Sequence, residues 1–231
     1  MFHVPINALT WTVGAVTLYT FSFKSWRTYS RTRNPLARMY SLLSLTFGTA
    51  LLFFGLPGLL TQNPHILRYT YFSADFFVQV SMQIQVWILW FLGLRNRVFL
   101  RYLYIFTIPF SLVLLTLEVL TSHVSISQSP YLIVYVDKPP VLILKSIIYV
   151  TIAMPIGYFL LRQTPLQTSW RAKAKSLASG MIFIAVCLAA TSNNIFDKGS
   201  DTPGSARTLL VVFIIFLLAQ LPRGSRAVHN P

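Results

Sequence analysis

The stretch RYTYFSADFFVQVSMQIQVWILWFLGLR, residues 68–95, decides the fold class of this chain. Between the arginines at its two ends, the one charged residue is Asp75. A helix over this stretch, at about 1.5 Å per residue, is roughly 39 Å long and can cross a bilayer with some tilt. One half of its helical wheel is polar and holds Asp75, Gln79, Gln83 and Gln85. A membrane helix must turn such a half away from lipid, so we expect it to lie against several other helices.

The composition places the whole chain in the same class. Of its 231 residues, 55% are hydrophobic and 10% are charged, whereas soluble domains carry about 25% charged residues. Apolar runs recur along the chain, which is typical of a polytopic membrane protein. We predict an all-α fold, a single-domain bundle of seven transmembrane helices, with spans over residues 6–23, 39–60, 69–94, 102–121, 141–161, 176–195 and 205–221.

The distribution of Lys and Arg predicts the direction of these spans. The net charge is +14, and 14 of the 19 basic residues follow the first, third, fifth and seventh spans. Basic loops face the cytoplasm, so we expect the N-terminus outside and the C-terminus in the cytoplasm of a plasma or inner membrane. Charge placed between apolar spans indicates contact with the lipid bilayer, and with anionic lipids at the cytoplasmic face, rather than with nucleic acid.

Two further features of the sequence bear on signal cleavage and on cysteine chemistry. Residues 1–23 contain no Lys or Arg, so they lack the charged start of a cleavable signal and are interpreted as a retained helix. The single cysteine, Cys187, excludes an intrachain disulfide and a cysteine-based zinc site.

Three ionisable residues lie inside predicted spans at a similar depth, in the outer third of the bilayer: Asp75, Glu118 and Lys145. A single charge at mid-membrane costs ~2.5–3.5 kcal/mol on insertion scales, so we expect Lys145 to contact at least one of the carboxylates. The functional interpretation is a proton relay, or the polar floor of an outward-facing cavity. The structural interpretation is a buried ion pair that joins the third, fourth and fifth spans. Glu118 can also extend to the outer surface.

The glutamines of the third span are a second polar feature. Gln79, Gln83 and Gln85 can each form hydrogen bonds across helices, which contribute ~0.6–2 kcal/mol apiece. They either hold neighbouring helices together or form a polar lining below Asp75, and the sequence does not separate these interpretations.

Three histidines, His3, His65 and His123, fall on the predicted outer side. Imidazoles gathered on one face can bind a metal, but no HxH or HxxxH spacing or nearby carboxylate supports such a site. We expect solvated side chains and keep these residues only as weak metal-binding candidates.

The longest connection between spans, residues 122–140, contains two β-prone runs. Residues 123–126 and 131–136 flank Gln128-Ser129-Pro130, a pattern that predicts a hairpin. A hairpin on the outer side can offer a strand edge to another chain, or it can simply cap the bundle. The basic loops on the inner side can bind an acidic protein partner.

No GxSxG, HExxH, Walker A or CxxC motif is present, so we predict a non-enzymatic protein. The first hypothesis is a sensor-like, ligand-binding or accessory subunit that works with a partner chain. The alternative is a small-solute or proton-coupled transporter that uses Asp75, Glu118 and Lys145. An intramembrane enzyme comes third, because no nucleophile–base pair or metal site supports it.

Seven spans with the N-terminus outside are similar to the layout of the rhodopsins. Retinal attachment requires a lysine in the last span, and residues 205–221 contain none, since Lys145 belongs to the fifth span. Retinal bound as a Schiff base to a lysine of the last span is therefore excluded, and the sequence leaves any other cofactor unknown. The layout also resembles, in span count and direction alone, the seven-helix membrane regions that precede some bacterial sensor kinases. No motif accompanies this likeness, and we assign no family.

Overall fold

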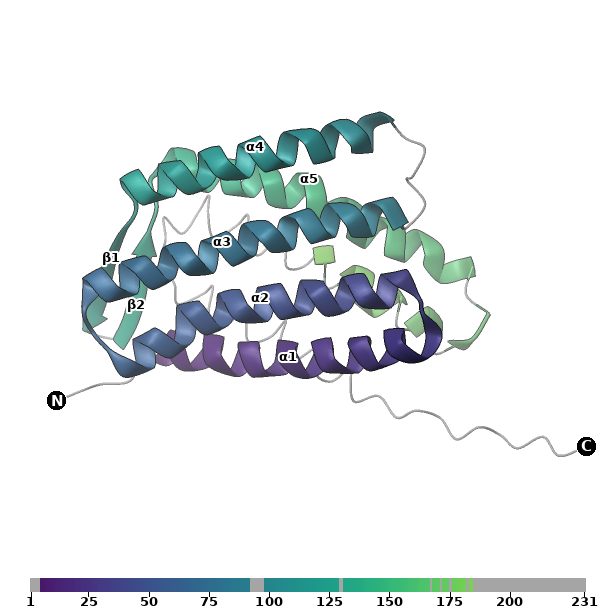
Figure 1. The fold of residues 1–231 in the computed structure, drawn as a ribbon, viewed down its shortest axis with the longest axis horizontal. Coiled ribbons are helices and arrows are strands. Elements are labelled where there is room, and N and C mark those ends of the chain that lie inside the picture. The colour runs from purple at the N-terminus through teal and green to yellow at the C-terminus, as the bar shows by residue number, and fades with distance from the viewer. Residues whose placement is uncertain are drawn as a thin grey trace, which may run out of the picture.

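Long helices run back and forth along one axis, and a two-stranded hairpin lies at the end where the third helix begins and the fourth ends (Figure 1). This computed structural model describes residues 5–91, 98–128, 131–166, 168–170, 172–174, 176–181 and 183–184. The described elements are α1 (Ile6–Thr32), α2 (Pro35–Leu60), α3 (Pro64–Leu89), α4 (Val98–Thr121), β1 (His123–Gln128), β2 (Tyr131–Val136), α5 (Pro139–Gln163) and the 3-10 turn η2 (Thr164–Leu166).

Asparagine–proline pairs start two of these helices. Asn34 precedes Pro35 at the start of α2, and its side chain accepts a hydrogen bond from the Leu36 N–H at 2.9 Å. Asn63 precedes Pro64 in the same way at the start of α3. The asparagine satisfies an otherwise unpaired N–H, and proline suits the first helical position because it has no N–H to satisfy.

The first helix is longer than the predicted span. Residues 6–23 were expected to cross the membrane and a basic loop to follow, but α1 continues as a helix to Thr32. The length of an apolar stretch determines how much of a helix can lie in lipid, but it does not determine where the helix ends. Lys and Arg are good helix formers, so the helix continues through them. The helix ends where Arg33 adopts a left-handed conformation, φ 53°, and donates its N–H to the Tyr29 carbonyl.

Three described helical segments are long and apolar enough to cross a membrane: Pro35–Leu60, Arg101–Thr121 and Pro139–Leu166. They coincide with the predicted spans at residues 39–60, 102–121 and 141–161. Helices α1 and α3 also coincide with predicted spans, but polar residues such as Asp75 and the glutamines of α3 lower their hydropathy. These two helices depend on their neighbours to cover a polar face.

The last two predicted spans are described in part or not at all. Residues 172–174, 176–181 and 183–184 are helical, so the span predicted at 176–195 is described as far as residue 184. This segment packs closely on α5, since a Cβ on Gly157 would lie 2.9 Å from the Gly180 carbonyl oxygen. The span predicted at 205–221 lies outside the described residues.

Small residues repeated every seven positions bring α1 and α2 together. Ala8, Ala15 and Ser22 on α1 are buried, as are Ser41, Gly48 and Gly55 on α2. The Ser22 hydroxyl lies 3.1 Å from that of Ser41 and 2.8 Å from its carbonyl oxygen. Such a seam allows two membrane helices to approach closely without a bulky side chain between them.

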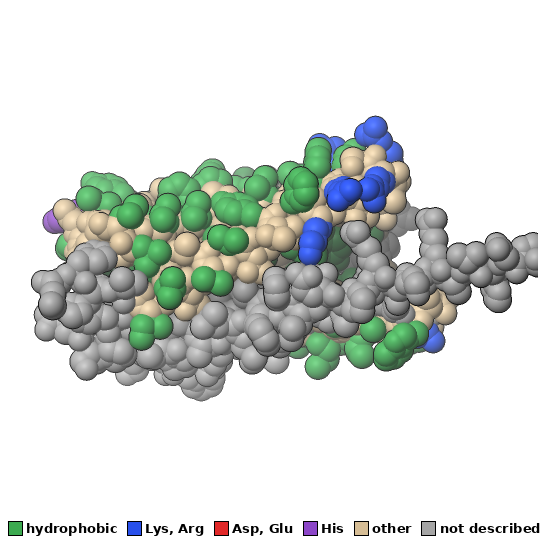
Figure 2. Space-filling model, turned by 90° about the horizontal axis from the view of Figure 1, so that it is seen from below, with side chains coloured by type: hydrophobic (Ala, Val, Ile, Leu, Met, Phe, Trp, Pro, Cys, Tyr) green, Lys and Arg blue, Asp and Glu red, His purple; other side chains and the backbone are tan. Residues whose placement is uncertain are grey.

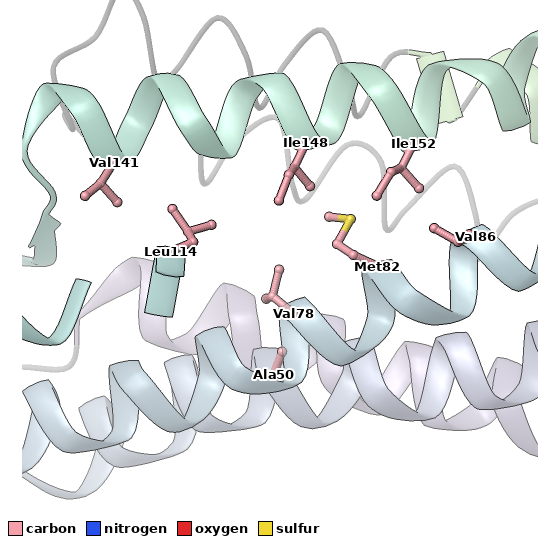
Figure 3. Close-up of a cluster of buried hydrophobic side chains, with 8 residues drawn as sticks. All are labelled: Ala50, Val78, Met82, Val86, Leu114, Val141, Ile148 and Ile152. Atoms are coloured by element: carbon pink, nitrogen blue, oxygen red, sulfur yellow. The ribbon is translucent and has the colours of Figure 1, made fainter. Parts of the chain in front are cut away.

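An apolar core joins α2, α3, α4 and α5. Figure 3 shows α3 supplying the middle of this core, with side chains of α5 opposite. Its buried members are Ala50, Val78, Met82, Val86, Leu114, Val141, Ile148 and Ile152. Helix α3 contacts α2, α4, α5 and β1, which confirms the expectation that it lies against several other elements.

The hairpin predicted in the long connection is confirmed. Strands β1 and β2 pair antiparallel, with His123 opposite Val136 and Gln128 opposite Tyr131. Both strands extend over the residues predicted to form them.

We predict that Gly55→Ala destabilises the protein by about 1–3 kcal/mol, because the added methyl group overpacks the seam. A Cβ at Gly55 would lie 2.7 Å from the Ala8 carbonyl oxygen and from the Thr12 nitrogen, both backbone atoms of α1. The matched control is Gly48→Ala, whose Cβ would meet side chains at 3.2–3.3 Å. Both changes gain the same helix propensity. Thermal unfolding in detergent should show the larger loss at Gly55, and equal unfolding temperatures would contradict this packing.

Candidate functional site

The charged cluster predicted from the sequence is present. Lys145 Nζ on α5 lies 2.8 Å from Asp75 Oδ2 on α3 and 2.8 Å from Glu118 Oε1 on α4. The exposed fractions of the three side chains are 11%, 5% and 0%. The predicted contact is confirmed with both carboxylates, so one ammonium group links three helices.

A third carboxylate, Asp137, joins the cluster and was not predicted. Its Oδ2 lies 2.7 Å from Lys145 Nζ. Asp137 follows β2 and precedes the Pro139-Pro140 start of α5, so the sequence places it in the outer connection. Side chains in a helix slope toward its N-terminus, and a lysine is long enough to reach back past its own first turns. The overlooked signal was therefore a carboxylate just before a helix that carries a buried lysine.

Two hydroxyl groups complete the cluster around Asp137. The Tyr71 hydroxyl on α3 donates to Asp137 Oδ2 at 2.6 Å and accepts from Lys145 Nζ at 3.0 Å. Ser122, the residue after α4, donates to Asp137 Oδ1 at 2.6 Å. Tyr71 lies one helical turn before Asp75, and this spacing placed both on one face of the helix.

These partners determine the charge state of Asp137. Burial alone would raise the pKa of its carboxyl group. The Lys145 ammonium, together with hydrogen bonds from Lys145, Ser122 and Tyr71, outweighs burial and holds this pKa below its ordinary value of 3.8. Asp137 is therefore ionised at neutral pH, and its contribution to stability is lost only as the pH falls below that value.

The hairpin is fixed both to α1 and to α3. Asn7 of α1 is fully buried, donates to the Ile133 carbonyl at 2.6 Å and accepts from the Ile133 N–H at 3.2 Å. The Tyr135 ring stacks on Tyr71, with centroids 4.6 Å apart and planes 13° from parallel. Tyr71 therefore contacts the hairpin through its ring and the ion cluster through its hydroxyl.

The three glutamines do not join the cluster. Gln83 holds α3 to α4, since it accepts from Thr107 at 2.9 Å and donates to Ser111 at 3.3 Å. Gln79 and Gln85 are buried, and their Oε1 atoms have no hydrogen-bond partner within the described part of the chain. The interpretation as a bond between helices is confirmed for Gln83, and the polar lining stays a prediction for the other two.

None of the ion pairs of the cluster involves His65 or His123. His65 and His123 are exposed, and His3 lies outside the described residues. Among the residues that the structure describes, no three His, Cys, Asp or Glu side chains are arranged to hold a metal ion.

Basic side chains gather at the end of the bundle opposite the hairpin (Figure 2). This end is formed by the last turns of α1 and α5 and the first turns of α2 and α4. Its exposed cations include Arg27, Arg31, Arg33, Arg38, Arg101 and Arg162.

An apolar groove of about 130 Å³ between α4 and α5 is lined by residues including Leu103, Phe106, Phe110 and Ile147. None of the cluster's ionisable groups lines it, so it gives no path to the cluster.

The chain matches no protein-family model, and comparisons with curated proteins and with solved structures give no match either.

We predict that Tyr71→Phe lowers stability by about 1–3 kcal/mol, because it removes one hydroxyl that both donates to Asp137 and accepts from Lys145. Tyr69→Phe is the matched control, since Tyr69 is on the same helix and 73% exposed. Thermal unfolding in detergent should show a loss only for Tyr71→Phe. Two variants with indistinguishable unfolding temperatures would mean that this hydroxyl does not stabilise the cluster.

Proposed function

We propose that this protein is a non-enzymatic, sensor-like membrane protein that responds to a ligand or partner at its hairpin and acts through a second chain. In this proposal seven spans cross a plasma or inner membrane, with the N-terminus and hairpin outside and the C-terminus in the cytoplasm. Three apolar helices and the basic end opposite the hairpin support this orientation.

The observation that carries the proposal is the set of partners of Asp137. This residue connects the hairpin to α5, and it contacts Tyr71 of α3, Ser122 after α4 and Lys145 of α5. The hairpin therefore cannot move away from the bundle without breaking contacts to three helices at once. A ligand that displaces the hairpin would change the relative positions of those helices, which is the requirement for passing a signal along them.

The basic end is the proposed output surface. Its exposed arginines suit anionic lipid headgroups, or an acidic surface on a partner chain. Helix α4 begins at this end and α5 finishes there, so a change in their spacing would alter this surface.

Transport of a small solute or of protons is the alternative. It requires water to reach Asp75, whose side chain is 5% exposed and bonded to Lys145. This burial favours the sensor-like proposal. Flux in proteoliposomes that is lost in Asp75→Asn and Lys145→Met, with both variants folded, would instead favour transport.

Cysteine labelling tests the orientation. In a Cys187→Ser background, Lys138→Cys should react with a membrane-impermeant maleimide in intact cells, because Lys138 is exposed beside the hairpin. Arg162→Cys, exposed at the basic end, should react only after lysis. Labelling of Arg162→Cys in intact cells would overturn the orientation.

Spin-label distances test the coupling. Labels at Arg101→Cys and Arg162→Cys, in the Cys187→Ser protein in lipid nanodiscs, report the spacing of α4 and α5 at the basic end. We expect Asp137→Asn to shift or broaden this distance distribution, because it loosens the links from the hairpin to the helices. Lys138→Gln is the matched control, since it changes the exposed neighbour of Asp137 and should leave the distribution unchanged. If Asp137→Asn does not fold, Tyr71→Phe takes its place, and an unchanged distribution would refute the coupling.

A further inference from the structure

The ion cluster contains more negative than positive charge. Three carboxylates surround one ammonium, so the formal charge is −2 if all are ionised. Each uncompensated ion costs several kcal/mol in a buried site. Asp75 Oδ2 and Glu118 Oε1 each lie 2.8 Å from the same nitrogen, so they are at most 5.6 Å apart. Like charges at such a distance disfavour ionisation of both groups.

The hydrogen bonds single out one of the three carboxyl groups. An ammonium has three N–H donors, and those of Lys145 go to Tyr71, Asp75 and Asp137. Asp137 also accepts from Tyr71 and Ser122, as suits an ionised group. Glu118 is fully buried, and within the described part of the chain neither of its carboxyl oxygens accepts a hydrogen bond, although Oε1 lies 2.8 Å from Lys145 Nζ. An ionised carboxylate needs donors, whereas a protonated one brings its own.

We propose that Glu118 holds a proton in the resting protein, and that Glu118 and Asp75 together form an exchangeable proton-binding site between α3, α4 and α5. The proton on Glu118 would be donated toward Asp75, which leaves Asp75 and Asp137 as the two anions facing Lys145. The cluster then has a formal charge of −1, and two oxygens that lacked partners belong to a neutral group.

The other polar groups around Glu118 are consistent with this assignment. From α3, Asp75 and Tyr71 face the cluster, and from α5 Lys145 does so. Asp137 approaches from the hairpin side. Arg68 of α3 is committed to the Val119 carbonyl at 2.8 Å and lies over the Phe72 ring, so in the described part of the chain it forms no ion pair with Glu118.

Loss of this proton would put a second negative charge beside Asp75 and push α4 away from α3. The consequence for signalling rests on the proposed function: proton release and hairpin displacement would then act on the same helices. The proton itself does not depend on that proposal, since it follows from the cluster alone.

Infrared spectroscopy of the full-length protein in lipid at pH 7 tests the inference. We expect a C=O stretching band of a buried protonated carboxyl group that shifts in D₂O. The chain has only five Asp and Glu residues, so single substitutions can assign the band. Glu118→Gln, which imitates the neutral carboxyl group, should abolish the band and unfold at the same temperature as wild type. Asp201→Asn, which lies in sequence between the sixth and seventh predicted spans, is the control and should retain it.

A wild-type spectrum without this band, or a band that persists in folded Glu118→Gln, would overturn the proton site. The first of these outcomes needs no variant, so the test does not depend on Glu118→Gln folding. The spectrum reports only protonation and the spin-label distances report only coupling, so the two proposals can fail separately.

Discussion

The structure depends on one buried ammonium group, that of Lys145, which contacts three carboxyl groups from different elements. Lys145 sits in an apolar helix, and no partner within α5 is positioned to compensate it. The carboxyl groups that contact it come from α3, from α4 and from the end of the hairpin. Without α5 these buried carboxyl groups would have no cation, which is far more costly than an imperfect apolar contact. The cluster therefore specifies which helices are neighbours and at what height they meet.

Within the described bundle, different interactions hold α1 to α2 and hold α3, α4 and α5 to one another. Helices α1 and α2 approach through small residues, so their association depends on close van der Waals packing. Helices α3, α4 and α5 are joined by charge and by an apolar core. The apolar core also includes Ala50 of α2, so it joins these two groups of helices. The hairpin adds a second connection, because Ile133 of β2 bonds to Asn7 of α1 while Tyr135 stacks on Tyr71 of α3.

The sequence predicts those residues whose local pattern is unusual, and it does not predict those whose role depends on contacts between distant elements. Asp75, Glu118 and Lys145 stand out because a charge inside an apolar run is rare, and the hairpin follows from local turn chemistry. Asp137 was treated as an ordinary loop residue, although it precedes a helix that carries a buried lysine eight positions later, and this lysine reaches back to it. Tyr71 reads as one more aromatic in a membrane helix, and its bridging role appears only when α3, α5 and β2 come together. The predicted end of the first helix, at residue 23, was wrong, because hydropathy indicates where a helix leaves the membrane and not where the helix itself ends.

The same cluster bears on the choice between transport and signalling. A transport pathway must expose its ion-binding groups to water from each side in turn. Here hydrogen bonds join four groups, and these bonds would all have to break: Tyr71, Asp75, Asp137 and Lys145. A sensor needs only a small change at one group of the cluster, and Glu118 is a carboxyl group whose oxygens accept no hydrogen bond within the described residues. Glu118 lies near the hairpin end of α4, and the other end of this helix is at the basic surface. In the proposed sensor-like function, a shift in its charge or position would be passed along α4 without opening the bundle, whereas the transport alternative requires the bundle to open.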